Sequence, residues 1–136
     1  MPQLDEARVN VRIKLAALWT SVMFCYIYAD YFDLYTPGKL HSMLEGLMRP
    51  LGAVTQGMLV GTSLMLAIPA VMIFLSVALP PAPCRWLNVV FGIVYTAIIL
   101  VTMWGWAFIV FYGVIEVALT LLVVWYAWKW PRTAGI

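Results

Sequence analysis

Residues 108–128 read FIVFYGVIEVALTLLVVWYAW, an apolar stretch interrupted by one carboxylate, Glu116. About 20 consecutive apolar residues form a helix long enough to cross the ~30 Å hydrocarbon core of a bilayer. The stretch therefore predicts a membrane-spanning helix. An ionisable side chain inside such a helix is costly, so it usually faces the interior of a helix bundle and has a partner or a function there.

The rest of the chain has the same character. Hydrophobic residues make up 65% of the 136 residues, charged residues make up 10%, and the mean hydropathy is +0.95. Soluble domains are nearer half apolar and a quarter charged. We predict an all-α integral membrane protein in which residues 1–136 form a single four-transmembrane-helix bundle. The expected spans cover residues 15–34, 52–79, 86–104 and 108–129.

Small residues and a proline mark the spans. Pro69 lies inside the second span and removes a backbone donor, which frees the carbonyl of Met65 and predicts a kink. Gly57 and Gly61 in the same span, and Gly113 in the fourth, allow close approach by another helix. The partner helix could belong to the same bundle or to a second copy in a homo-oligomer, and the sequence leaves both alternatives open.

Lysine and arginine fall unevenly on the two sides of the predicted bundle. Lys39 and Arg49 lie in the loop between the first two spans. The other six of the eight lie on the side of the two termini, and they are Arg8, Arg12, Lys14, Arg85, Lys129 and Arg132. Because cytoplasmic segments carry the excess of basic residues, both termini are predicted to be cytoplasmic.

The loop between the first two spans has a helical pattern of its own. Apolar residues recur there at helical spacing, and they are Leu40, Met43, Leu44, Leu47 and Met48. Pro50 disfavours helical geometry at Arg49. We expect residues 39–49 to form a short amphipathic helix on the outer membrane surface. It could be a plain connector or a lid over the mouth of the bundle.

Polar side chains gather in the outer third of the predicted bundle. Counted from the outer ends of the spans, Asp30 and Gln56 lie about 6 Å deep and Glu116 lies about 12 Å deep. These residues predict an outward-facing polar cavity with two acids. Its expected members are Asp30, Glu116, Gln56, Tyr26, Thr102 and Asp33.

Three functions fit such a cavity. The first is a small transporter or channel for a cation, a proton or a proton-coupled solute. The second is a non-catalytic accessory or assembly subunit of a larger membrane complex, in which Glu116 only holds helices together. Acid–base catalysis is the third, and the sequence supports it least because His41 is the single histidine and no Cys-x-x-Cys or glycine-rich phosphate loop is present. We therefore expect no catalytic residues and no cofactor, while metal binding stays open.

Several segments resemble an uncharacterised family of small bacterial membrane proteins, a domain of unknown function. They are KLAALWTS at residues 14–21, YADYFDLYTPG at 28–38 and TMWGW at 102–106. The resemblance implies a bacterial four-helix protein, and hence a multi-pass protein of the inner (plasma) membrane. It brings no chemistry with it. The expected partners are the lipid bilayer, a small cation or proton, and a second copy or larger complex; the net charge of +2 gives no reason to expect nucleic acid.

Overall fold

The computed structural model describes residues 2–48 and 51–132. Four long helices account for most of these residues: α1 (Val11–Asp33), α3 (Gln56–Ala78), α4 (Pro81–Thr102) and α5 (Ala107–Trp128). Each is long and apolar enough to cross a membrane. The prediction of four such helices is confirmed. Among the predicted ends of these four helices, the start of α4 differs most from the structure: the helix begins at Pro81 rather than at residue 86. Proline is tolerated there because the backbone N–H groups of the first helical turn have no acceptor within the helix.

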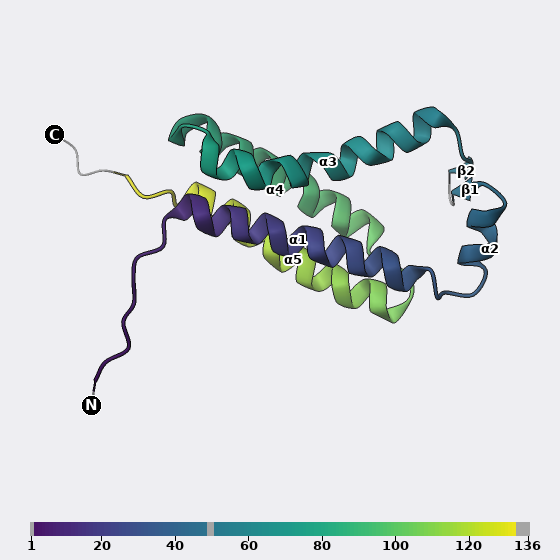
Figure 1. The fold of residues 1–136 in the computed structure, drawn as a ribbon, viewed down its shortest axis with the longest axis horizontal. Coiled ribbons are helices and arrows are strands. Elements are labelled where there is room, and N and C mark those ends of the chain that lie inside the picture. The colour runs from purple at the N-terminus through teal and green to yellow at the C-terminus, as the bar shows by residue number, and fades with distance from the viewer. Residues whose placement is uncertain (1, 49–50, 133–136) are drawn as a thin grey trace.

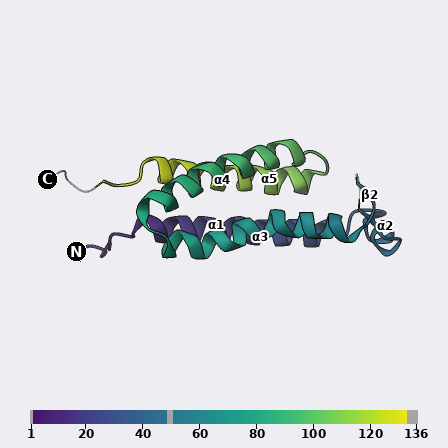
Figure 2. The same ribbon diagram turned by 90° about the horizontal axis from the view of Figure 1, so that it is seen from above.

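The four helices form two layers. Figure 2 shows α1 and α3 in one layer and α4 and α5 in the other. The main contacts join α3 to α1, α1 to α5 and α5 to α4, whereas α3 and α4 touch only slightly. Both described ends of the chain lie at one end of the bundle, which we call the terminal end, and α2 lies at the opposite, loop end (Figure 1).

The segment after α1 differs from the expected helix over residues 39–49. Helix α2 spans only Lys39–Leu44, and a two-residue strand β1 (Leu47–Met48) then pairs with β2 (Gly52–Ala53). The helix ends early because Gly46 has a φ of +74°, a left-handed conformation that terminates helices and favours glycine. The prediction of one continuous amphipathic helix to Arg49 is therefore wrong. Arg49 itself lies outside the described residues.

Pro69 has the predicted effect on α3. The carbonyl of Met65, which proline leaves without its helical donor, accepts a hydrogen bond from the hydroxyl of Tyr95 on α4. Helix α3 changes direction along its length, and it diverges from α4 toward the loop end (Figure 1). The kink thus gives α3 a polar contact with α4 where the two helices begin to separate.

A buried polar network joins three helices nearer the terminal end. The side chain of Asn88 is fully buried, and its Oδ1 accepts a hydrogen bond from Trp19 Nε1 at 2.8 Å and from Ser76 Oγ at 3.4 Å. Its Nδ2 donates to the Cys84 carbonyl at 2.9 Å. Asn88 thereby connects α4 to α1 and α3.

The glycines divide into packed and unpacked positions. A Cβ on Gly113 would lie 2.5 Å from Met103 Cβ, and one on Gly92 would lie 2.6 Å from Val124 Cγ2, so both glycines allow α4 and α5 to approach closely. A Cβ on Gly61, by contrast, would have no described residue outside its own helical turn within 4 Å, and one on Gly57 would meet only Thr55 Oγ1, at 3.9 Å. Packing inside the described bundle therefore uses Gly113, and not the Gly57/Gly61 pair.

Candidate binding cavity

A cavity of about 320 Å³ lies in the loop half of the bundle, where α3 and α4 diverge. All four long helices contribute to it. Its wall contains three acids, three tyrosines and a threonine among apolar side chains, and the polar members are Tyr26, Asp30, Asp33, Tyr95, Thr102, Tyr112 and Glu116. Five of the six predicted site residues therefore line one space.

Glu116 is the most deeply placed acid of the cavity. It lies in the middle of α5 and is 7% exposed, yet it makes no hydrogen bond or ion pair with any described residue. Every fully enclosed side-chain nitrogen and oxygen in the described part of the chain has a hydrogen-bond partner. The carboxyl oxygens of Glu116 must therefore reach the cavity. A buried carboxyl group without a protein partner is costly, so its position calls for a ligand, a proton or water.

Asp30 and Tyr26 lie one helical turn apart on α1 and present polar atoms to the same cavity. Asp30 is exposed and, like Glu116, has no ion-pair partner within residues 2–48 and 51–132. Asp30 and Glu116 both line one cavity, from the adjacent helices α1 and α5. The charge of Lys39 acts on Asp30 from beyond the end of α1, but no basic residue among those described forms an ion pair with either acid.

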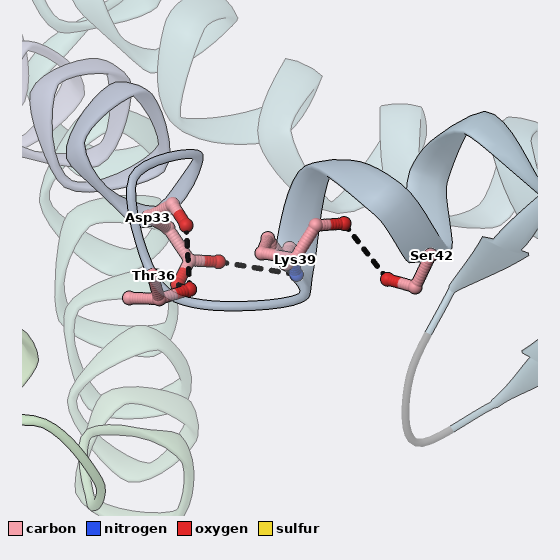
Figure 3. A network of polar contacts seen from close by, with 4 residues as sticks. All are labelled: Asp33, Thr36, Lys39 and Ser42. Carbon is pink, nitrogen blue, oxygen red and sulfur yellow. Dashed lines mark hydrogen bonds and ion pairs between the residues drawn. The ribbon is translucent and has the colours of Figure 1, made fainter.

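Asp33, at the end of α1, is held differently. Its Oδ2 lies 3.1 Å from Lys39 Nζ, and Thr36 Oγ1 donates to its backbone carbonyl at 2.7 Å (Figure 3). Ser42 Oγ in turn donates to the Lys39 carbonyl at 2.8 Å. These contacts fix the turn between α1 and α2 and place one ammonium group beside the acid nearest the loop end. Asp33 is thus ion-paired, whereas Asp30 and Glu116 form no ion pair with a described residue.

Gln56 does not join this cavity, contrary to the expectation from its counted depth. The count assumed a helix beginning at Gly52. Instead Gly52 belongs to β2, and Gln56 is the first residue of α3, with its side chain exposed. The half of α3 toward the loop end, which begins at Gln56, also leans away from α4 (Figure 1).

Two tyrosines of the cavity were not predicted as site residues. Tyr112 lies four residues before Glu116, so both fall on one face of α5, and that spacing could have identified it. Tyr95 lines the cavity while its hydroxyl donates to Met65. Its role depends on a contact between α3 and α4 that no pattern within α4 encodes.

The described residues contain no group of three or more His, Cys, Asp or Glu side chains arranged to hold a metal ion. Thr102 adds no free donor, because its hydroxyl donates to the carbonyl of Ile98 at 2.8 Å. The cavity can therefore offer two carboxyl groups, tyrosine rings and apolar walls. Such a set can bind a positive charge or exchange protons.

Residues 3–135 match a family of unknown function. The chain belongs to that family, DUF6326. The match covers nearly the whole sequence, and it agrees with the resemblance to an uncharacterised family. No curated protein and no solved structure with which the chain was compared matches it. Membership of DUF6326 assigns no activity to the chain.

Proposed function

We propose that this DUF6326 protein is a multi-pass protein of a bacterial inner membrane. Four apolar helices carry large hydrophobic side chains on their outward faces: Val101 is 78% exposed, Phe74 67% and Phe111 62%. Apolar surface of this extent suits contact with lipid or another protein. The bacterial origin follows from the resemblance of the sequence segments alone.

We further propose that both termini are cytoplasmic. At the terminal end, Arg85 donates to the carbonyls of Ala127 at 3.0 Å and Trp128 at 3.2 Å, and its guanidinium lies over the rings of Trp86 and Trp128. Arginine and tryptophan side chains placed in this way are typical of the membrane interface. The excess of basic residues at this end supports its cytoplasmic placement.

Labelling of single cysteines in intact cells checks the orientation. With a membrane-impermeant maleimide, His41→Cys should react from outside, and Arg132→Cys should react only after the cells are permeabilised. Both positions are exposed. The variants are made in a background without Cys25 and Cys84, and that background serves as the blank. Labelling of Arg132→Cys in intact cells would reverse the proposed orientation.

The leading proposal for function is a small transporter or channel for a cation or a proton-coupled solute. The observation that carries it is the unpartnered, buried carboxyl group of Glu116 in a cavity that Asp30 also lines. Ionisable groups inside membrane helices mark ion pathways and proton relays when they face a bundle interior. No hydrogen bond joins Glu116 to a described residue, and Thr102 donates to Ile98 instead, so no protein contact of this carboxyl group supports a purely structural role.

The alternative is an accessory subunit that packs against a larger membrane complex. One observation favours it: Gly57 and Gly61 form a small-residue pair on α3 with no packing partner in the described chain. Such pairs support close helix contacts in membranes. The same pair would equally serve a homo-oligomer, so it fits either function.

Flux into proteoliposomes decides between transport and the accessory role. Wild-type protein should move K⁺, Na⁺, methylammonium or protons down a gradient faster than protein-free liposomes do. Ion-sensitive dyes inside the vesicles report each species. If a correctly folded, reconstituted protein gives protein-free rates for all four, transport of these small cations is excluded and the accessory role is favoured.

A further inference from the structure

The cavity has an unbalanced negative character at its deep end. Glu116 projects from α5 with 7% of its surface exposed and no partner among the described residues, and Asp30 faces the same space from α1. Lys39 acts on the charge of Asp30, but it forms its ion pair with Asp33, at 3.1 Å. A ligand that complements this end carries a positive charge and can donate hydrogen bonds to carboxyl oxygens.

The walls of the cavity are apolar and aromatic. Leu66 from α3, Ile98 and Ile99 from α4 and Ile109 from α5 line its sides. The rings of Tyr26, Tyr95 and Tyr112 add faces that attract cations. A hydrated inorganic ion gains little from such walls, since hard cations prefer six or more oxygen ligands.

The size of the cavity points the same way. Its volume of about 320 Å³ lies at the lower end of the range of about 300–1,000 Å³ for sites that bind small organic molecules. Those sites combine mostly apolar walls with a few polar groups that fix orientation. A single inorganic cation fills only a small part of this space.

We propose that the ligand of this cavity is an organic ammonium ion with an apolar body, held by Glu116 and Asp30 at its charged end and by the tyrosine and isoleucine walls along its body. The inference rests on the proposed transport function and names its substrate class. An organic ammonium ligand accounts both for the two acids without an ion-pair partner and for the apolar lining of the cavity. A site that only exchanges protons does not require the apolar lining.

Binding to the protein in lipid nanodiscs tests the proposal, with three probes and protein-free nanodiscs subtracted. Phenethylammonium has both charge and apolar body, 2-phenylethanol replaces the ammonium group by a neutral hydroxyl, and methylammonium keeps the charge without the body. By isothermal titration calorimetry, phenethylammonium should bind wild-type protein at least about tenfold more tightly than either other probe. Equal affinity for phenethylammonium and 2-phenylethanol, or for phenethylammonium and methylammonium, would overturn the proposal.

Variants locate the site. Glu116→Gln should weaken phenethylammonium binding by about tenfold or more, because it removes the charge that pairs with the ammonium group. Asp30→Asn should weaken it in the same direction. Glu45→Gln is the matched control, since Glu45 is exposed and pairs with His41 at 3.0 Å outside the cavity. Wild-type affinity in a folded Glu116→Gln protein would contradict the proposed site, and if that variant misfolds, the comparison of the three probes on wild type still decides.

The two proposals fail in different ways. Flux of K⁺ or protons without binding of phenethylammonium would remove the organic ligand and leave the transport function intact. Binding of phenethylammonium that depends on Glu116, without flux of phenethylammonium itself or of K⁺, Na⁺, methylammonium or protons, would keep the ligand and remove transport.

Discussion

Replacing Glu116 with glutamine is expected to reduce cation flux in proteoliposomes by about tenfold or more, toward the rate of protein-free liposomes. Glutamine keeps the shape of the side chain and its ability to hydrogen-bond, but it can neither carry a negative charge nor exchange a proton. Glu116 is buried, and the other acid of the cavity without an ion pair, Asp30, lies on a different helix and is exposed. The measurement is the initial rate of dye response at equal amounts of reconstituted protein.

Two further variants separate this effect from general damage. Glu45→Gln makes the same substitution at an exposed glutamate outside the cavity, so it should keep the wild-type rate of cation flux. Asp33→Asn should have an intermediate effect, since Asp33 lines the cavity but is already paired with Lys39. Flux at the wild-type rate in a folded Glu116→Gln protein would exclude the carboxyl group from the transport pathway.

The sequence predicts the helices well because their signal is local. A run of apolar residues about 20 long encodes each helix without reference to the others. The same holds for the acids of the cavity: helical spacing places Tyr26 and Asp30 on one face of α1, and the rarity of carboxylates in apolar helices identifies Glu116. These residues indeed line one cavity.

The errors arise where structure depends on backbone geometry or on contacts between helices. An apolar stripe favoured a continuous helix over residues 39–49, but the left-handed backbone at Gly46 ends α2 at Leu44. Gly52 and Ala53 form β2 instead of the first turn of the second span, so α3 begins at Gln56, and this residue lies outside the cavity. The stripe was a weaker signal than the glycine within it.

The buried network around Asn88 shows a second limit. Within α4 alone, Asn88 is one polar residue near the start of an apolar helix. Its partners Trp19 and Ser76 come from α1 and α3, so only the packing of three helices reveals what Asn88 does. This network lies toward the terminal end, away from the cavity. It therefore has a structural role that is separable from the function proposed for Glu116.

Replacing Asn88 with leucine should lower the free energy of unfolding by about 1–3 kcal/mol, the typical penalty for stranding a buried polar group. Leucine has the same branched shape, although it is larger, and it accepts no hydrogen bond, so Trp19 Nε1 and Ser76 Oγ would lose the oxygen that they share. Both side chains are fully buried, and no water replaces the lost acceptor cheaply. Reversible unfolding in mixed detergent micelles, followed by circular dichroism, gives the measurement.

Further variants test whether loss of the Asn88 hydrogen bonds causes the decrease in the free energy of unfolding. Ser76→Ala should cost less than Asn88→Leu, because it removes only the longer, 3.4 Å contact and leaves the 2.8 Å bond from Trp19 in place. Gln56→Leu, an amide-to-leucine change at an exposed position, should leave the free energy of unfolding nearly unchanged. Asn88→Leu should also keep its affinity for phenethylammonium, since Asn88 does not line the cavity. An Asn88→Leu protein as stable as wild type would show that the network contributes little net free energy, as is the case for many polar contacts between membrane helices.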